Sequence, residues 1–130
     1  MTQESLYQFF GNDRFATRLC GISILEARDG YARCAMPLTA DHLNANGFAQ
    51  GGAIFTLCDF AFAVAANAGD HPTVSLGSQI TYVKPGTGGQ LIAVATEQAA
   101  TRKTSLFEVR VTDDAGALVA LATVNGFRKG

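Results

Sequence analysis

The feature that most constrains the fold of this chain is the largely apolar segment from Gly51 to Gly69, which has a single charged residue, Asp59. Its length would suit a membrane span, but it is rich in Ala and Gly and lacks flanking Lys and Arg anchors. A carboxylate near the centre of a bilayer would also cost several kcal/mol. The segment therefore predicts a helix surrounded by protein on nearly all sides, with Gly69 as its C-terminal stop.

Strand patterns lie on both sides of this helix. Before it, Asp29-Gly30 separates two extended runs, which is a strong hairpin signal, and Pro37 ends the second run. After the helix only strand patterns remain, with short turns between them. In chain order we expect short helical turns at residues 5–10 and 14–19, a strand beginning near Ile22, a strand at 31–36, a loop at 39–50, the helix, and strands at 73–83, 89–100, 105–112 and 118–127.

This order of elements indicates an α+β fold. Late strands that are joined by short turns pair antiparallel. One long apolar helix and one antiparallel sheet predict the hotdog architecture, in which a curved antiparallel sheet of five to six strands wraps a central helix. The 130 residues, 48% of them apolar, are enough for a single such domain over residues 1–130 with its own core.

The charge balance limits the classes of partner. Ten basic and eleven acidic residues give a net charge of −1, so charge alone would not recruit nucleic acid or an anionic membrane. Charged residues make up 16% of the chain, against roughly 25% in an average globular protein. A surface with so few charges predicts that some apolar area is covered by a second copy, so we expect a homo-oligomer.

The cysteines and histidines give no sign of a metal centre. Cys20, Cys34 and Cys58 are odd in number and form no CxxC, and the polar N-terminus lacks a secretion signal. We therefore expect a cytoplasmic protein whose cysteines are reduced packing residues. His42 and His71 fall in loops and are interpreted as surface residues, and no short-spaced Cys and His set predicts a metal ion.

The start of the helix and its single acid are the candidate chemical groups. A helix start presents unpaired N–H groups, and Gly51-Gly52 would let a ligand approach them, as an oxyanion site requires. Asp59, if buried without a partner, would have a raised pKa. Plainer interpretations stay open: Asp59 could bond to backbone or a nearby hydroxyl, the glycines could serve close packing, and Gln50 could cap the helix.

Distance separates these groups within one chain. Eight residues of helix lie between Gly51 and Asp59, which is about 12 Å at 1.5 Å per residue. One small reacting group cannot meet both. Two such helices packed antiparallel across a twofold axis would bring Asp59 of one subunit to Gly51 of the other and create two equal sites. The hypothesis makes the dimer a condition of activity.

The run Asn44-x-x-Gly47-x-x-Gln50-Gly51-Gly52, followed by Asp59, resembles the PaaI-type hotdog thioesterases, the phenylacetate-degradation group. The resemblance continues through residues 75–86 and 101–104 and covers about residues 15–127. It implies hydrolysis of an aromatic (phenylacetyl-, hydroxyphenylacetyl- or benzoyl-type) or medium-chain acyl-CoA to the free acid and CoA. It also implies a homodimer that pairs into a homotetramer and no cofactor apart from the CoA of the substrate.

The resemblance also implies roles for single residues. Asp59 would act as general base or nucleophile, the Gly51 N–H of the facing subunit would polarise the carbonyl, and Asn44 would orient water or the thioester. Ser75 would help to place the attacking water. The CoA phosphates would lie near the turn at residues 102–104. The substrate-binding candidates are thus Gly52, Phe48, Arg102, Lys103 and Thr104, with Phe55, Phe60 and Phe62 as further candidates for the acyl pocket.

One position departs from the family pattern. The family commonly has His-Gly-Gly where this chain has Gln50-Gly51-Gly52. Glutamine can donate and accept hydrogen bonds but cannot take up a proton near neutral pH, so Gln50 is expected to brace the loop or the thioester. Two alternatives remain: an acyl-CoA-binding protein without turnover, and a hotdog hydratase or dehydratase, which would normally pair a histidine with the acid.

Overall fold

The computed structural model describes residues 2–129, and its elements follow the predicted order. Two short helical segments precede the sheet, as expected, although the second is a π-helical turn. The elements are α1 (Gln3–Gly11), η1 (Phe15–Leu19), β1 (Ser23–Arg28), β2 (Tyr31–Pro37), η2 (Ala40–His42), α2 (Gly51–Asn67), β3 (Thr73–Tyr82), β4 (Gln90–Ala100), β5 (Thr104–Thr112) and β6 (Leu118–Arg128).

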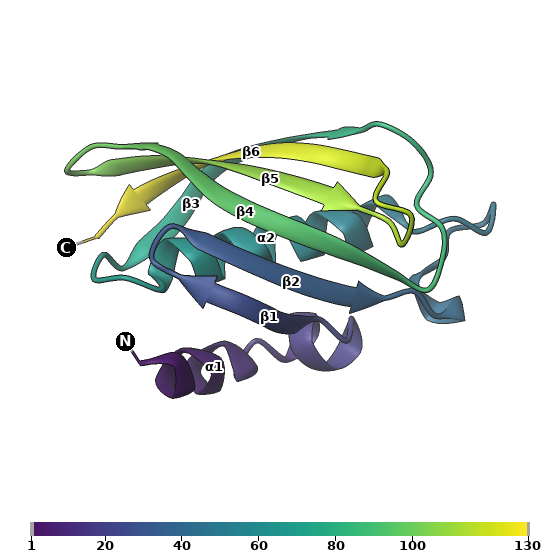
Figure 1. Cartoon of the computed structure of the whole chain (residues 1–130), viewed down its shortest axis with the longest axis horizontal. Coiled ribbons are helices and arrows are strands. Elements are labelled where there is room, and N and C mark those ends of the chain that lie inside the picture. The colour runs from purple at the N-terminus through teal and green to yellow at the C-terminus, as the bar shows by residue number, and fades with distance from the viewer. Residues whose placement is uncertain (1, 130) are drawn as a thin grey trace.

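The six strands form one antiparallel sheet that curves around α2, and this confirms the predicted architecture (Figure 1). The order across the sheet is β1-β2-β4-β5-β6-β3, and α2 packs against all six strands. Consecutive strands β4, β5 and β6 pair as their short turns predict. β3 does not pair with β4 but crosses to the far edge beside β6, so β1 and β3 are the two edge strands.

The core lies between α2 and the concave face of the sheet. The α2 residues that face the sheet are fully buried, among them Leu57, Phe60 and Val64. Phe107 of β5 meets Phe62 of α2 edge to face, with ring centroids 5.2 Å apart. All three cysteines are free and buried, as predicted for packing residues. The nearly continuous apolar sequence of α2 is thus explained by protein on most sides, and no helix within residues 2–129 is long and apolar enough to cross a membrane.

The C-terminal end of α2 corrects one expectation. The helix ends at Asn67, near the predicted place, but Gly69 does not adopt the left-handed conformation of a glycine stop. The Asn67 side chain donates to the Ala63 and Thr73 carbonyls and accepts from the Thr73 N–H, at 2.8, 3.1 and 2.9 Å. Gly69 is needed for a different reason, because a Cβ there would collide with the Asp29 carboxylate.

The prediction that His42 lies on the surface is wrong, whereas His71 is exposed as expected. The Thr39 N–H donates to His42 Nδ1 at 3.1 Å, so the proton is on Nε2, which donates to the Cys20 carbonyl at 2.7 Å. The side chain is 8% exposed because backbone groups satisfy both ring nitrogens. His42 thereby ties the loop before α2 to the end of η1.

Candidate active site

Asp59 projects from the middle of α2 into a cavity of about 600 Å³ between α1, α2 and the start of β3. Ser75 lines the same cavity, so the structure brings together two residues that the sequence singled out. The cavity is also lined by aromatic rings, a second carboxylate, an amide and one cation: Phe9, Phe10, Phe62, Asp70, Asn67 and Lys129.

The position of Ser75 relative to Asp59 is set by Asn67. Residues 59, 63 and 67 are four apart and share one face of α2, which faces this cavity. The Asn67 amide then holds both backbone groups of Thr73, the first residue of β3. Ser75 follows two residues later, so the anchored strand carries its hydroxyl to the cavity that contains Asp59.

The Asp59 carboxylate accepts no hydrogen bond and forms no ion pair within residues 2–129, which disfavours the interpretation that it is a satisfied structural acid. Its side chain reaches solvent, but surrounding protein still raises its pKa by desolvation, and the negative charge of Asp13 raises that pKa further. A carboxylate without a partner and with a raised pKa, at the wall of a cavity, is suited to accept a proton.

At the other end of the helix, Gln50 is the N-cap of α2. Its Oε1 accepts from the Ala53 N–H at 2.9 Å, and its own N–H donates to the His42 carbonyl at 2.8 Å. The capping interpretation of Gln50 is therefore confirmed. The N–H groups of Gly51 and Gly52 have no partner in the described part of the chain, so two adjacent donors remain free at the positive end of the helix.

Gly51 lines a second cavity, of about 400 Å³, together with Asn44, Phe48 and Tyr82. Asn44 Oδ1 accepts from the N–H groups of Asn46 and Phe48 and so closes the loop before the helix. The Tyr82 hydroxyl donates to the Gly51 carbonyl at 2.9 Å. Asn44, Phe48 and Gly51 therefore line one cavity.

A third cavity, of about 520 Å³, contains Gln50 and Gly52. Asp59 and Gly51 thus line different cavities of one chain, which agrees with their separation of about 12 Å along the helix. The described chain therefore presents a free carboxylate and a serine hydroxyl in one cavity, and the free N–H of Gly51 together with Asn44 in another.

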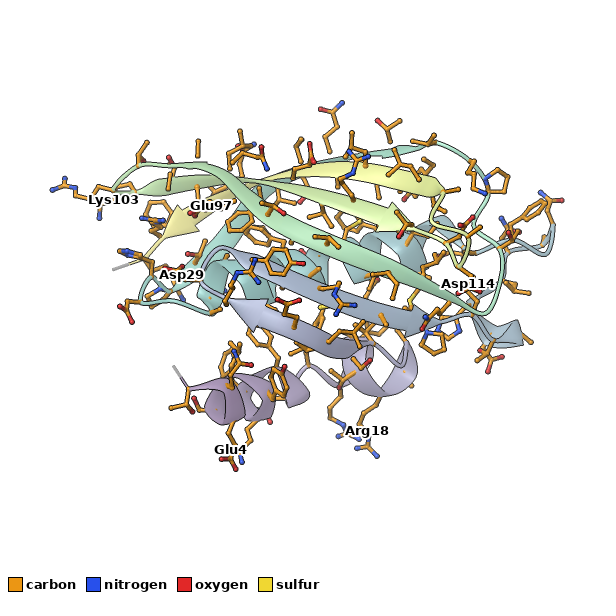
Figure 2. All side chains as sticks on the ribbon, viewed as in Figure 1. Glu4, Arg18, Asp29, Glu97, Lys103 and Asp114 are labelled. Carbon is orange, nitrogen blue, oxygen red and sulfur yellow. The ribbon has the colours of Figure 1, made fainter. Side chains whose placement is uncertain are left out.

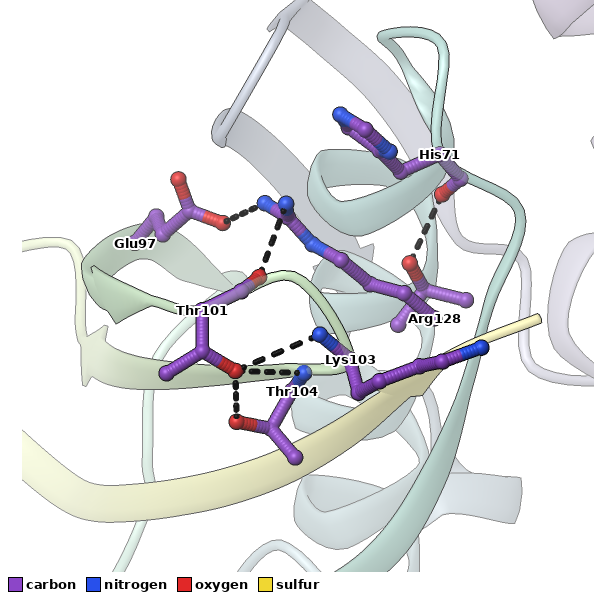
Figure 3. A network of polar contacts seen from close by, with 7 residues as sticks. His71, Glu97, Thr101, Lys103, Thr104 and Arg128 are labelled. Carbon is purple, nitrogen blue, oxygen red and sulfur yellow. Dashed lines mark hydrogen bonds and ion pairs between the residues drawn. The ribbon is translucent and has the colours of Figure 1, made fainter. Parts of the chain in front are cut away.

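Arg102, Lys103 and Thr104 lie at the turn between β4 and β5 and line none of these three cavities. The turn is closed by Thr101 Oγ1, which accepts from the N–H groups of Lys103 and Thr104 (Figure 3). Arg128 supports it by donating to the Thr101 carbonyl at 3.1 Å. Lys103 lies at one end of the sheet, far from Asp114 at the other (Figure 2).

The aromatic residues that were candidates for the acyl pocket differ in burial. Phe60 and Phe62 belong to the core, and of these two only Phe62 reaches the Asp59 cavity, whereas Phe55 is partly exposed. Sequence reasoning missed Phe9, Phe10, Lys129, Asn67 and Tyr82. The four-residue spacing after Asp59 could have found Asn67. No local signal places Phe10 in the cavity, because α1 is located by tertiary contacts such as the edge-to-face contact of Phe10 with Phe60.

Residues 46–120 match the family model described as the thioesterase superfamily. A putative esterase of Archaeoglobus fulgidus is 36% identical over 120 residues, which cover 92% of this chain and 77% of that protein. The acyl-coenzyme A thioesterase PaaI of Escherichia coli is 30% identical over 119 residues, which cover 91% of this chain and 84% of that protein.

Solved structures also resemble this chain. The Escherichia coli PaaI protein, from the phenylacetic acid degradation operon, aligns with a TM-score of 0.86 at 25% identity, over 99% of this chain and 97% of that one. The protein smu.793 of Streptococcus mutans, solved with acetyl CoA bound, aligns with a TM-score of 0.79 at 31% identity, over 84% of this chain and 89% of that one.

Proposed function

The chain belongs to the thioesterase superfamily and is a thioester hydrolase, and we propose that it hydrolyses an aromatic or medium-chain acyl-CoA to the free acid and CoA. One observation carries the proposal: a carboxylate without a partner and two free N–H groups lie at separate places on the same helix. These are the groups that a thioester hydrolase needs for a proton acceptor and an oxyanion site.

We propose that a second copy of the chain completes the site. Within residues 2–129, β3 pairs only with β6, and this edge strand carries Val74 and Leu76, which are 42% and 67% exposed. Gly52, Phe55 and Asp59 are the exposed residues of α2 and lie on one face. A twofold pairing would cover this helix face and extend the sheet across two β3 edges, and it would set Asp59 opposite the partner's Gly51. A pair of such dimers would give the expected tetramer.

In this arrangement the Gly51 N–H receives the thioester oxygen as negative charge develops on it. Asp59 either removes a proton from water, whose oxygen then bonds to the carbonyl carbon, or attacks that carbon itself and is released by water afterwards. In both routes the carbon–sulfur bond breaks and the sulfur leaves as CoA thiol after gaining a proton. Asn44 would orient the reacting groups, and the Ser75 hydroxyl would hold the water near Asp59.

The cavity beside Asp59 suggests where the acyl group lies. Phe9, Phe10 and Phe62 present aromatic rings to it, and aromatic rings pack well edge to face against one another. An aryl or medium-length acyl group would therefore fit between α1 and α2. The CoA portion would extend over the surface, where Arg102 and Lys103 would contact phosphates, with Thr104 holding their turn. The acetyl CoA bound to the Streptococcus mutans protein supports a CoA ester as ligand.

The direct test is release of CoA thiol from phenylacetyl-CoA, hydroxybenzoyl-CoA and straight-chain acyl-CoAs, measured with a thiol-reactive dye. We expect release by the native chain and a loss of about 10²- to 10⁴-fold in kcat for Asp59→Asn. Asp70→Asn, which removes another carboxylate from the same cavity, should retain activity. Cys34 and Cys58 will not interfere, because burial raises both pKa values to about 12.

A different outcome would identify the binding protein that the sequence left open. If no ester is cleaved but CoA esters raise the melting temperature, the chain binds acyl-CoA without turnover. In that case Gln50 serves only as the helix cap seen here.

A further inference from the structure

Tyr82 makes a contact that the proposed reaction does not yet use. It is the last residue of β3, and its hydroxyl donates to the carbonyl oxygen of Gly51 at 2.9 Å. Its ring also lies against the glycine, since a Cβ at Gly51 would be 3.3 Å from the ring carbon that bears the hydroxyl. The side chain therefore touches the first residue of α2 from the side of the second cavity.

The carbonyl of Gly51 and the N–H of Gly52 belong to one peptide group. A hydrogen bond accepted by the carbonyl polarises that amide and makes its N–H a stronger donor. The same bond fixes the plane of the peptide and hence the direction in which the N–H points. The Gly52 N–H has no partner within residues 2–129, so this strengthened donor is available to bind a ligand.

We propose that Tyr82 is a positioning residue for the oxyanion site: its hydroxyl fixes and polarises the Gly51–Gly52 peptide, so that the Gly52 N–H joins the Gly51 N–H in binding the thioester oxygen. The inference rests on the proposed function and deepens it. It assigns the oxyanion site two donors instead of one, and it gives the residue at the end of β3 a role in the reaction.

A purely structural role fits the contacts less well. The start of α2 is already held from the other side, where the Gln50 N–H donates to the His42 carbonyl and the Gln50 side chain caps Ala53. Tyr82 is 48% exposed, so the core does not depend on its ring. Desolvation by the surrounding protein raises the pKa of Tyr82, so the hydroxyl keeps the proton that it donates.

The test compares Tyr82→Phe, which keeps the ring and loses only the hydroxyl, with Tyr31→Phe, which removes a strand tyrosine hydroxyl far from the helix start. For Tyr82→Phe we expect kcat for thiol release to fall about tenfold, while KM changes less than about twofold, because the lost polarisation matters most in the transition state. Tyr31→Phe should leave both constants unchanged. A rise in KM without a fall in kcat, or no change at all, would overturn the proposal.

A second measurement does not depend on turnover. We compare ¹H–¹⁵N spectra of the native chain and of Tyr82→Phe. In the variant, we expect the Gly52 amide proton to move upfield and to exchange faster with solvent, while the melting temperature stays nearly constant. Tyr31→Phe should move neither. If the Gly52 amide moves but no ester is ever cleaved, the proposed function fails and the contact with Tyr82 stands. If esters are cleaved and the amide is unaffected, the role of Tyr82 fails alone.

Discussion

Asp59 and Gly51 lie on the same helix but open onto different cavities of the chain. About 12 Å of helix separates them, which no rotation of a side chain can close. The first is a carboxylate without a partner, and the second begins a pair of free N–H groups. This relationship is the basis of the proposal that each site is shared between two subunits.

Replacing Gly51 with proline removes the N–H group of this residue and so tests that donor by itself. Gly51 is the first residue of α2, where proline is tolerated in a helix because its missing N–H would have no helical partner. Gly51→Pro should therefore leave the helix intact but lower kcat by about 10²- to 10³-fold. Gly51→Ala keeps the N–H and places a Cβ 3.3 Å from the Tyr82 ring, so it should lose far less. Equal losses in both variants would argue against an oxyanion role.

The charge at Asp13 should shift the pH dependence of the reaction. Desolvation and then Asp13 raise the pKa of Asp59, so the acid limb of kcat/KM should lie above the ordinary carboxyl value of 3.8. Asp13→Asn removes the charge and can keep the cap on the Ala16 N–H. It should move the limb to lower pH, whereas Glu4→Gln should not. A limb that stays in place would contradict the predicted influence of Asp13 on the group that controls it.

The aromatic wall of the Asp59 cavity can be tested by substrate choice. Phe9 is partly exposed and lines this cavity, so Phe9→Ala should disturb the core little. We expect kcat/KM for aryl-CoA esters to fall roughly three- to tenfold relative to short straight-chain esters. Leu106→Ala, on the exposed side of β5, should not alter this ratio. An equal change for all esters would place the acyl group elsewhere.

An ion pair between a buried carboxylate and a partly exposed lysine predicts how acid destabilises the fold. Lys84 Nζ lies 2.7 Å from Asp113 Oδ2, and Asp113 Oδ1 accepts from the N–H groups of Ala115 and Ala117. The hydrogen bond from Lys84 is the main reason that the pKa of Asp113 is below 3.8. Its contribution to stability is therefore complete above that pH and is lost as the pH falls through the lowered pKa of the folded state.

Denaturation of Asp113→Asn and the native chain at several pH values tests this linkage. The native chain should be the more stable at pH 7, and the difference should shrink as the pH falls below the ordinary carboxyl value of 3.8. A difference that does not change with pH would show that the carboxylate charge is not involved.

The periodicity of the sequence was enough to predict the helix and the strands because apolar spacing follows burial directly. The pairing of β3 with β6 was not predictable from turn length, since the segment between β3 and β4 crosses the sheet instead of closing a hairpin. The burial of His42 was missed for a similar reason: its partner, the Cys20 carbonyl, is 22 residues away in sequence. Asp59, Gly51 and Gln50 were identifiable because they interrupt or begin an apolar helix.

Site residues that come from distant elements are not marked by any local pattern in the sequence. Tyr82 contacts Gly51 across 31 residues, and Phe9 reaches the Asp59 cavity only because α1 packs beside β1 and α2. The cation that lines this cavity is Lys129, and not Arg102 or Lys103. The place of Lys129 depends on where β6 ends. Such relationships come from strand register and helix packing, and local patterns do not contain them.

Mixed dimers test the shared site most directly. Asp59→Asn and Gly51→Pro should each be nearly inactive alone, but a dimer with one subunit of each has one site with both mutations and one site with neither. Random mixing at equal amounts should restore about one quarter of native activity, because half of the dimers are mixed and each has one intact site. Restoration near that level would support a site built from two subunits. Mixtures no more active than the separate variants, with subunit exchange verified, would contradict it.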